Sequence, residues 1–280
     1  RGGLPEIADA LELLSLRPQR HLLGAPEVPT PDGVAPRRFI QLQDVSFAYG
    51  VDARPVIRGV NLTIPIGARI ALVGRTGSGK TTLAHLLLGL FQPTSGELLL
   101  DGIEVSDHEI PAWQANCAFV PQTIRLIDGS IRDNVAFGCD PDLIDDDQVW
   151  AALEAARFDD FVAGMTYGLY TMIGENGIKL SGGQRQRPRL ARAFFRGAKV
   201  LVLDEATSAL DNKTEHHVMQ ALDIVGRRCT TIVIAHRLST VKKCDVIYEM
   251  ADGEIIHSGD FQQLQERSAS FREMALIEEA

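Results

Sequence analysis

Along most of the chain, segments of consecutive apolar residues alternate with segments in which apolar residues recur at helical spacing. Residues 70–73, 200–203 and 231–235 are almost entirely apolar and rich in β-branched side chains. Runs of this kind are typical of strands that are buried on both faces of a parallel sheet. Residues 39–47 and 60–64 come before the first run and are bounded by turn residues. These earlier segments predict a small antiparallel sheet beside an α/β core.

The remaining patterns divide the chain further. Residues 94–102 predict one more strand of the small sheet, and residues 123 to about 190 have mostly helical spacing. Residues 4–16 form an amphipathic pattern, and five prolines between 18 and 36 predict an extended linker. We therefore expect a helix and linker over 1–36, a core with the antiparallel subdomain over 37–122 and 190–280, and a helical subdomain over 123–189.

A glycine-rich loop directly follows the run at 70–73. Residues 74–81 read Gly-Arg-Thr-Gly-Ser-Gly-Lys-Thr, and the leucines that follow predict a helix. Such a loop turns its backbone N–H groups toward a phosphate chain at the positive helix end. A flexible glycine turn is the alternative, but the flanking strand and helix favour phosphate binding. The leucines expected on one helical face are Leu83, Leu86, Leu87 and Leu90. The residues predicted to bind the nucleotide are Gly74, Thr76, Gly77, Ser78, Gly79, Lys80, Thr81 and Thr82.

Two carboxylates end the run at 200–203. Ligands of open α/β sheets collect at the carboxyl ends of strands, which is where Asp204 and Glu205 fall. We expect Asp204, with the Thr81 hydroxyl, to hold Mg²⁺, and Glu205 to polarise the water that attacks the terminal phosphate. The alternative is that the two carboxylates simply end the strand in solvent. The acidic run Asp145 to Asp147, earlier in the chain, is instead expected to cap a helix, because it occupies the first turn of that helix.

Composition restricts the possible partners. The 280 residues are 45% hydrophobic, and 37 acidic against 28 basic residues give a net charge of −9, so the electrostatic footprint of a nucleic-acid-binding protein is missing. The four cysteines show no paired spacing, which favours reduced thiols in the cytosol. No apolar run is long enough to span a membrane, so we expect a soluble polypeptide. It begins at Arg1 rather than at methionine, and we interpret it as part of a longer protein.

A second glycine pair opens the helix that begins after Leu180. Ser181 can cap this helix, and Gly182 and Gly183 leave its N–H groups open to a phosphate, although a merely capped helix is an equal alternative. At this point the chain resembles the nucleotide-binding domain of ATP-binding cassette (ABC) transporters. Residues 180–184 are similar to the family signature, and the match runs from about Phe39 to the C-terminus.

The resemblance implies a fold, cofactors and further site residues. The fold is a P-loop NTPase (RecA-like) core with an antiparallel β subdomain and an α-helical subdomain, and the cofactors are ATP and Mg²⁺. Tyr49 resembles the residue that stacks on adenine. Gln122 resembles the glutamine that senses Mg²⁺ and the attacking water, and His236 resembles the histidine that contacts the terminal phosphate. Lys80 and Glu205 complete the implied catalytic set.

The family pairs its domains head to tail, so each phosphate loop is covered by the partner's signature helix. The resemblance implies that Ser181, Gly182, Gly183 and Gln184 complete the partner's site, together with Asp211 of a D-loop-like segment. This arrangement allows a homodimer or a paired cassette. It also implies that a single domain hydrolyses ATP poorly.

Residues 172–177 resemble the X-loop of exporters, where Glu175 would face the transmembrane domain. The implied role is the ATPase motor of an ABC exporter at the cytoplasmic face of the membrane, without nucleic acid. A soluble cassette ATPase acting on DNA or ribosomes is the alternative, but such relatives carry a coiled-coil insertion or a second cassette, and this chain shows neither. An importer is disfavoured by Glu175. The sequence of residues 173–177 also resembles the corresponding segment of lipid-linked oligosaccharide flippases.

Pro188 departs from the family pattern, which has an aliphatic residue after Gln-Arg-Gln-Arg. Proline inside a helix removes a hydrogen bond and clashes with the preceding turn, which costs ~3 kcal/mol. We therefore expect a kinked or weakened signature helix.

Overall fold

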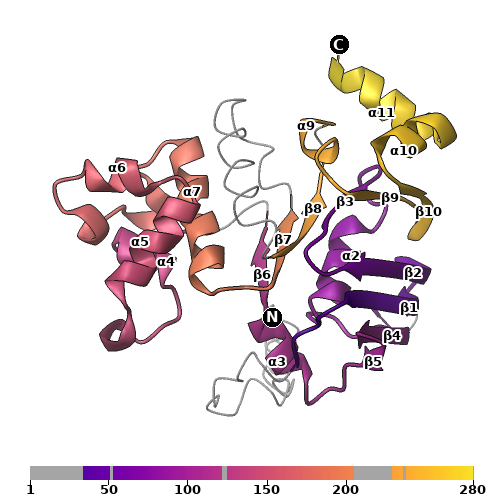
Figure 1. Ribbon diagram of the computed structural model, residues 1–280, viewed down its shortest axis with the longest axis horizontal. Helices are drawn as coiled ribbons and strands as arrows, with labels where there is room; N and C mark the ends of the chain where they lie inside the picture. The colour runs from indigo at the N-terminus through magenta and orange to yellow at the C-terminus, as the bar shows by residue number, and fades with distance from the viewer. Residues whose placement is uncertain (1–33, 51–52, 122–124, 205–228, 236–237, 280) are drawn as a thin grey trace, which may run out of the picture. The chain divides into compact units, whose positions relative to one another are not determined.

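The fold is described by a computed structural model that covers residues 34–50, 53–121, 125–204, 229–235 and 238–279 (Figure 1). Two sheets and several groups of helices make up this part of the chain. The predicted α/β class, with an additional antiparallel sheet, is confirmed.

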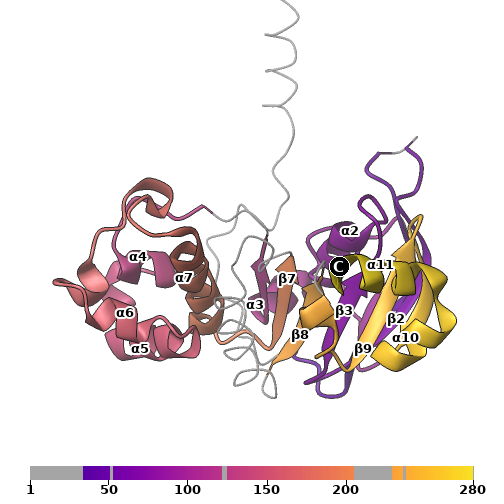
Figure 2. The same ribbon diagram turned by 90° about the horizontal axis from the view of Figure 1, so that it is seen from above.

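The larger sheet has six strands in the order β10-β9-β3-β8-β7-β6, and Figure 2 shows its central strands side by side. All neighbours from β9 to β6 are parallel, and β10 pairs antiparallel to β9. The three apolar runs of the sequence form the central strands β3, β8 and β7. The strand bounds are β3 (Arg69–Val73), β6 (Cys117–Val120), β7 (Val200–Asp204), β8 (Thr230–Ile234), β9 (Val246–Ala251) and β10 (Glu254–Gly259).

Alternate side chains of this sheet enter two different hydrophobic cores. Ala71 and Val73 belong to one core, which they share with helices of the region 131–195 and with Phe271. Ile70 and Leu72, between them, belong to the other core, which also contains the smaller sheet. Burial on both faces explains why these strands are continuous apolar runs rather than alternating ones.

The smaller sheet is antiparallel and has the order β2-β1-β4-β5. The predicted strand at 39–47 is confirmed as β1 (Phe39–Phe47). The strand predicted at 60–64 is longer, β2 (Ile57–Pro65). The segment 94–102 forms β4 (Ser95–Leu100), which turns into a short strand β5 (Ile103–Glu104). The predicted antiparallel subdomain is therefore present.

The helix after the glycine-rich loop is α2 (Lys80–Leu87), and it is shorter than its leucines suggested. Leu83, Leu86 and Leu87 are buried, but Leu90 is 48% exposed. The expectation for Leu90 is wrong because the helix ends at Leu87 and Gly89 has a φ of +65°, which turns the chain away from the helical path. Next along the chain, α3 (Ile110–Ala115) buries Trp113, whose indole N–H donates to the carbonyl of Leu87 at 2.9 Å.

Helices and 3₁₀ turns are the named elements of region 131–195, in agreement with the helical spacing predicted for residues 123 to about 190. The α-helices are α4 (Ile131–Val135), α5 (Asp146–Ala155), α6 (Asp159–Ala163) and α7 (Gly182–Phe195), and the 3₁₀ turns are η3 (Pro141–Leu143), η4 (Gly168–Tyr170) and η5 (Glu175–Gly177). Helix α7 crosses the predicted subdomain boundary at 189/190, and the division of the chain into subdomains stays a prediction. Pro188 lies inside α7, whose helical assignment continues through it.

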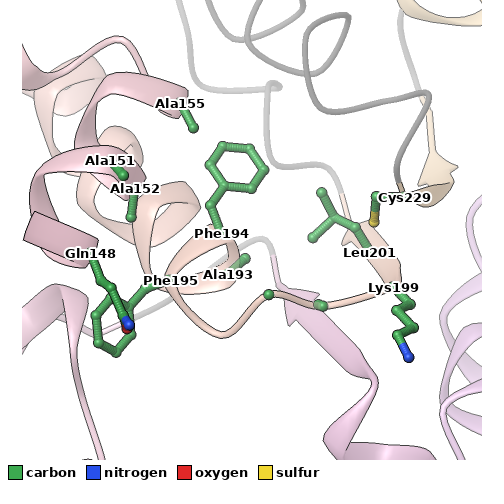
Figure 3. Close-up of a pocket in the computed structure, with 12 residues that line it drawn as sticks. Gln148, Ala151, Ala152, Ala155, Ala193, Phe194, Phe195, Lys199, Leu201 and Cys229 are labelled. Atoms are coloured by element: carbon green, nitrogen blue, oxygen red, sulfur yellow. The ribbon is translucent and has the colours of Figure 1, made fainter. Parts of the chain in front are cut away.

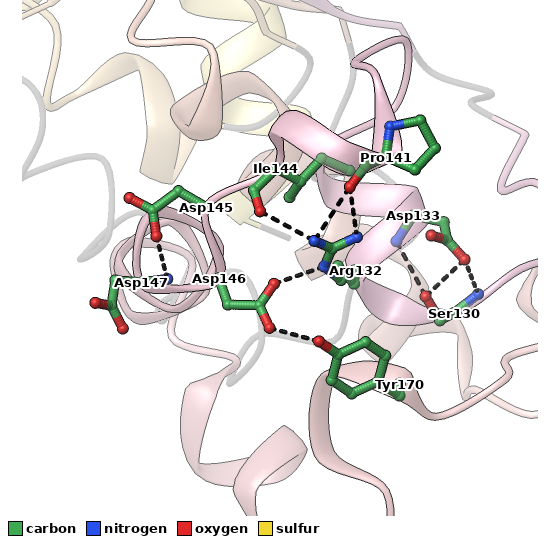
Figure 4. A network of polar contacts seen from close by, with 9 residues as sticks. All are labelled: Ser130, Arg132, Asp133, Pro141, Ile144, Asp145, Asp146, Asp147 and Tyr170. Atoms are coloured by element: carbon green, nitrogen blue, oxygen red, sulfur yellow. Dashed lines mark hydrogen bonds and ion pairs between the residues drawn. The ribbon is translucent and has the colours of Figure 1, made fainter.

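The acidic segment before α5 caps that helix, as expected. The Asp145 carboxylate accepts the backbone N–H of Asp147 at 2.9 Å. Asp146 instead pairs with the Arg132 guanidinium of α4 and accepts the Tyr170 hydroxyl at 2.7 Å (Figure 4). In the described part of the chain, no group of three or more His, Cys, Asp or Glu side chains is arranged to hold a metal.

The C-terminal part contains α9 (Leu238–Val241), α10 (Phe261–Arg267) and α11 (Ala269–Glu279). Leu264 and Phe271 from α10 and α11 pack into the core that contains Ala71 and Val73. None of the helices that the structure describes is long and apolar enough to span a lipid bilayer.

Candidate phosphate-binding site

The glycine-rich loop joins the carboxyl end of β3 to the start of α2, as the sequence predicts. Gly74 has a φ of +142°, and a Cβ at this position would lie 2.2 Å from the carbonyl oxygen of Met250 on β9. Gly79, the N-cap of α2, has a φ of +101°, and its Cβ would lie 2.8 Å from the Ile57 side chain. Side chains would therefore clash with the scaffold or strain the backbone at both ends of the loop.

Lys80 is the first residue of α2 and is 6% exposed. Its ammonium group donates to the carbonyl oxygens of Gly74 at 2.8 Å and Arg75 at 3.0 Å. The positive charge therefore lies against the loop, next to the helix start where an anion is favoured. A hollow of about 200 Å³ adjoins it. The residues lining this hollow are Val56, Thr76, Gly77, Gly79, Lys80, Thr81, Thr82 and Ile234.

The two residues predicted to hold a metal lie together. The Thr81 hydroxyl donates to the Asp204 carboxylate at 3.1 Å, although 123 positions separate them in the sequence. Parallel pairing explains this meeting: Asp204 pairs with Ile234, and Leu72 at the end of β3 pairs with the same Ile234 from the other side. A hydroxyl and a carboxylate are hard oxygen donors of the kind that Mg²⁺ prefers, so the residues present fit that ion.

Tyr49 reaches the same helix from the end of β1. Its hydroxyl hydrogen-bonds with the Thr82 hydroxyl at 2.8 Å, and the residue is 63% exposed. The ring centroids of Phe47 and Phe91 lie 5.1 and 5.7 Å away, both edge to face. Tyr49 is thus held at its edges while a large part of its surface is open.

His85 is a neighbour of the site that the sequence reasoning missed. Its ring packs edge to face between Phe91 and Phe119, with centroid distances of 5.1 and 5.3 Å. Burial lowers the pKa of His85, and the nearby Asp204 charge opposes that shift. Helical spacing could have identified His85, because it follows Thr81 by four residues and therefore shares its helix face.

The second glycine-marked helix start has the predicted cap. The Ser181 hydroxyl accepts the backbone N–H of Gln184 at 3.3 Å, and the Gln184 side chain accepts the N–H of Ser181 at 2.9 Å. This reciprocal capping box leaves Ser181 and Gly182 exposed. A Cβ on Gly182 would meet nothing within 4 Å. None of residues 181–184 lines the hollow beside Lys80.

Four predicted site residues, Gln122, Glu205, Asp211 and His236, lie outside the described residues. The glycine-rich loop also borders a larger cavity of about 730 Å³, which extends from Gly74–Ser78 to Glu273 and Met274 of α11. A third cavity, of about 630 Å³, is lined by none of the predicted site residues that the structure describes (Figure 3). It is mostly apolar, with Phe194, Leu201 and Cys229 on its walls and Lys199 at its rim.

The comparisons with known proteins agree with this geometry. Residues 57–208 match the family model described as "ABC transporter". The chain is 46% identical over 228 residues to an ATP-dependent lipid A-core flippase of Burkholderia orbicola, an alignment that covers 81% of this chain and 38% of the relative. It is 43% identical over 236 residues to the ABC multidrug transporter MDR2 of Trichophyton rubrum, covering 84% of this chain and 18% of that protein.

A solved structure is similar as well. A bacterial Atm1-family ABC exporter with ATP bound superposes with a TM-score of 0.84 at 33% sequence identity, covering 99% of this chain and 47% of that chain. The chain therefore spans less than half the length of the relatives it matches.

Proposed function

This chain belongs to the ABC transporter family as a nucleotide-binding ATPase domain, and we propose that it powers an exporter by binding and hydrolysing ATP between two paired domains. The observation that carries the proposal is the hydrogen bond between Thr81 and Asp204, beside the phosphate loop. These side chains come from different elements, and their contact supports a Mg²⁺–phosphate site that they would share.

The phosphate chain binds over the loop at 74–79 and the start of α2. There the backbone N–H groups and the positive helix end stabilise the negative charge. The Lys80 ammonium exchanges the carbonyls of Gly74 and Arg75 for the outer phosphates. The open part of the Tyr49 ring stacks on adenine, and Thr82 fixes the Tyr49 hydroxyl.

Thr81 and Asp204 hold Mg²⁺, with Gln122 as a further ligand. When bound, the ion neutralises charge that develops on the transferred phosphate. Glu205, directly after Asp204, orients the attacking water, and His236 contacts the terminal phosphate. These roles of Gln122, Glu205 and His236 come from the family resemblance.

The signature helix completes the site of a second domain. The capping box uses the Ser181 hydroxyl and the Gln184 side chain locally, while the exposed backbone around Gly182 stays open to a ligand. None of residues 181–184 lines the hollow beside Lys80, which supports their action in a partner's site together with Asp211. The pair is a homodimer or two similar cassettes.

In the whole protein, we propose that the domain works at the cytoplasmic face of a membrane below a transmembrane domain, which Glu175 faces. The relatives reported above are named as a flippase, a multidrug transporter and an exporter, and none is named for DNA or ribosomes. This favours transport over a soluble ATPase that acts on nucleic acid.

The test is the ATPase rate per monomer as a function of protein concentration, with size-exclusion chromatography in ATP and Mg²⁺. We expect the wild-type rate to rise with concentration, and Glu205→Gln to form a dimer that ATP stabilises. Ser181→Ala should lower the rate, and the matched control Ser106→Ala, outside the site, should not. A rate that does not depend on concentration, together with a persistent monomer, would refute the paired site.

A further inference from the structure

Phe91 is the central ring of a group of four that lies along one side of α2. The Phe47 ring stacks on it, with the two centroids 5.2 Å apart. The rings of Tyr49 and His85 meet Phe91 edge to face, at centroid distances of 5.7 and 5.1 Å. Pairs with these distances and angles attract each other beyond the area that they bury. We call these four residues the aromatic cluster, and Phe91 contacts all the other members.

The turn at the end of α2 brings Phe91 to this place. The helix ends at Leu87, and the φ of +65° at Gly89 is one that residues with side chains rarely adopt. The backbone N–H groups of Leu90 and Phe91 both donate to the carbonyl of His85, at 2.9 and 3.4 Å. The turn leaves Leu90 exposed and directs Phe91 back onto the helix. The position of Phe91 is therefore fixed by the way in which the helix ends.

The aromatic cluster is supported by both sheets. Phe47 is the last residue of β1 and is 9% exposed. His85 packs edge to face against Phe119 of β6, with the centroids 5.3 Å apart. Phe91 itself is partly buried against the core that contains the smaller sheet. Phe91 cannot move away from Tyr49 without losing these contacts.

The segment 91–94 also holds the backbone next to Tyr49. The Thr94 hydroxyl accepts the N–H of Ala48 at 3.2 Å, and the Thr94 N–H donates to the carbonyl of Ser46 at 2.8 Å. One short segment thus restrains both the ring of Tyr49 and the chain that leads to it.

The hydroxyl bond of Tyr49 does not by itself fix the plane of its ring. The Tyr49 hydroxyl is hydrogen-bonded to the Thr82 hydroxyl at 2.8 Å. Rotation about the last side-chain torsion leaves this oxygen in place while the ring plane turns, and that torsion has broad energy wells in tyrosine. The edge-to-face contacts with Phe47 and Phe91 restrict the rotation. A flat base needs one ring plane on which to stack, so these contacts bear on binding.

We propose that Phe91 is a positioning residue for nucleotide binding, which holds the Tyr49 ring in the plane that stacks on the base. This inference rests on the proposed function, in which Tyr49 stacks on adenine. Phe91 acts through Tyr49 and does not have to touch the nucleotide. Without the Phe91 ring, Tyr49 occupies the competent plane for only part of the time, and the apparent affinity falls by that fraction. The phosphates bind at the loop 74–79 and are not affected.

The test compares two ligands in the presence of Mg²⁺ by isothermal titration calorimetry. One is AMP-PNP, an ATP analogue that resists hydrolysis, and the other is inorganic tripolyphosphate. Both have a phosphate chain, but only AMP-PNP has a base. We expect Tyr49→Ala to weaken AMP-PNP binding about tenfold, the order of one base stacked on an aromatic ring. Phe91→Leu should weaken it about threefold, the order of one lost aromatic pair, and neither variant should change tripolyphosphate binding.

A double variant shows whether Phe91 acts through Tyr49. If it does, Tyr49→Ala combined with Phe91→Leu should bind AMP-PNP as Tyr49→Ala alone does. Independent effects would multiply to a loss of about thirtyfold, and that result would overturn the proposal. Phe91→Tyr keeps an aromatic ring and should bind both ligands like the wild type.

Phe161→Leu is the matched control. Phe161 on α6 stacks on Phe158 with the centroids 5.0 Å apart, so the same substitution removes an aromatic pair outside the aromatic cluster. It should change the binding of neither ligand. Circular dichroism of each variant verifies that it is folded.

The outcomes separate this proposal from the proposed function. If Phe91→Leu weakens both ligands equally, Phe91 has a general structural role and the proposal is wrong. If Tyr49→Ala weakens AMP-PNP alone and Phe91→Leu has no effect, the proposal is wrong while the stacking role of Tyr49 stands. If Tyr49→Ala has no effect either, the stacking role fails, and the role of Phe91 fails with it.

Discussion

Replacement of Pro188 tests how much stability the signature helix loses to its proline. Pro188 is the seventh residue of α7 and is buried, and it cannot donate to the carbonyl of Gln184 one turn earlier. A proline inside a helix costs ~3 kcal/mol relative to alanine. Alanine lacks two of the buried side-chain carbons, which lowers the gain by ~0.8 kcal/mol for each.

The two terms predict a net gain of about 1.4 kcal/mol for Pro188→Ala. For a chain of this size that is a rise in Tm of roughly 3–6 °C. Pro188→Ile loses none of the buried side-chain carbons and adds one, so it avoids the burial loss of alanine. It should gain somewhat more, because isoleucine has only a slightly lower helix propensity than alanine. Differential scanning calorimetry or thermal circular dichroism measures the shift.

The matched control is Pro141→Ala. Pro141 is exposed and is the first residue of the turn η3, where proline fits the backbone and no N–H is needed. The same substitution should therefore leave Tm unchanged there, or lower it because the unfolded chain gains freedom. An unchanged or lower Tm for both Pro188 variants would refute the argument, since it would mean that α7 has adapted to the proline without loss.

Three further predictions concern thiols, an ion pair and a buried indole. Only the exposed Cys139 should react rapidly with a thiol reagent in the native state, because burial raises the pKa of the other three thiols. Rapid reaction of more than one thiol per chain would contradict this. The bond from Arg132 lowers the pKa of Asp146, so its stabilisation is present above the usual value of 3.8 and is lost as the pH falls through the lower folded pKa. Asp146→Asn should lower stability by less than ~1 kcal/mol at pH 7 and have no effect in strong acid, as urea unfolding at several pH values can measure. Trp113→Phe leaves the carbonyl of Leu87 without its indole donor and creates a small cavity. It should therefore lower the free energy of unfolding by about 2–4 kcal/mol, as measured by urea unfolding. A loss below about 1 kcal/mol would mean that water replaces the indole.

The sequence alone determined the class of the fold and the chemistry of the phosphate loop, because both depend on local patterns. Continuous apolar runs indicated the central strands, and the glycines, Lys80 and Thr81 stand at fixed spacing on one turn and one helix. The Ser181 cap could also be predicted from the sequence, because it involves only residues within one helical turn. Leu90 was the exception, since a spacing rule cannot sense where a helix ends.

Only the tertiary structure decided which distant residues meet. The order of the parallel strands brings Asp204 to Thr81, and the packing of α2 encloses His85 between two aromatic rings from other segments. The arginines of α7 are spaced as a stripe in the sequence, but the position of Arg189, Arg192 and Arg196 beside β6 comes from packing. Contacts between remote segments depend on how whole elements bury their apolar faces, and that is a property of the folded chain rather than of any local pattern.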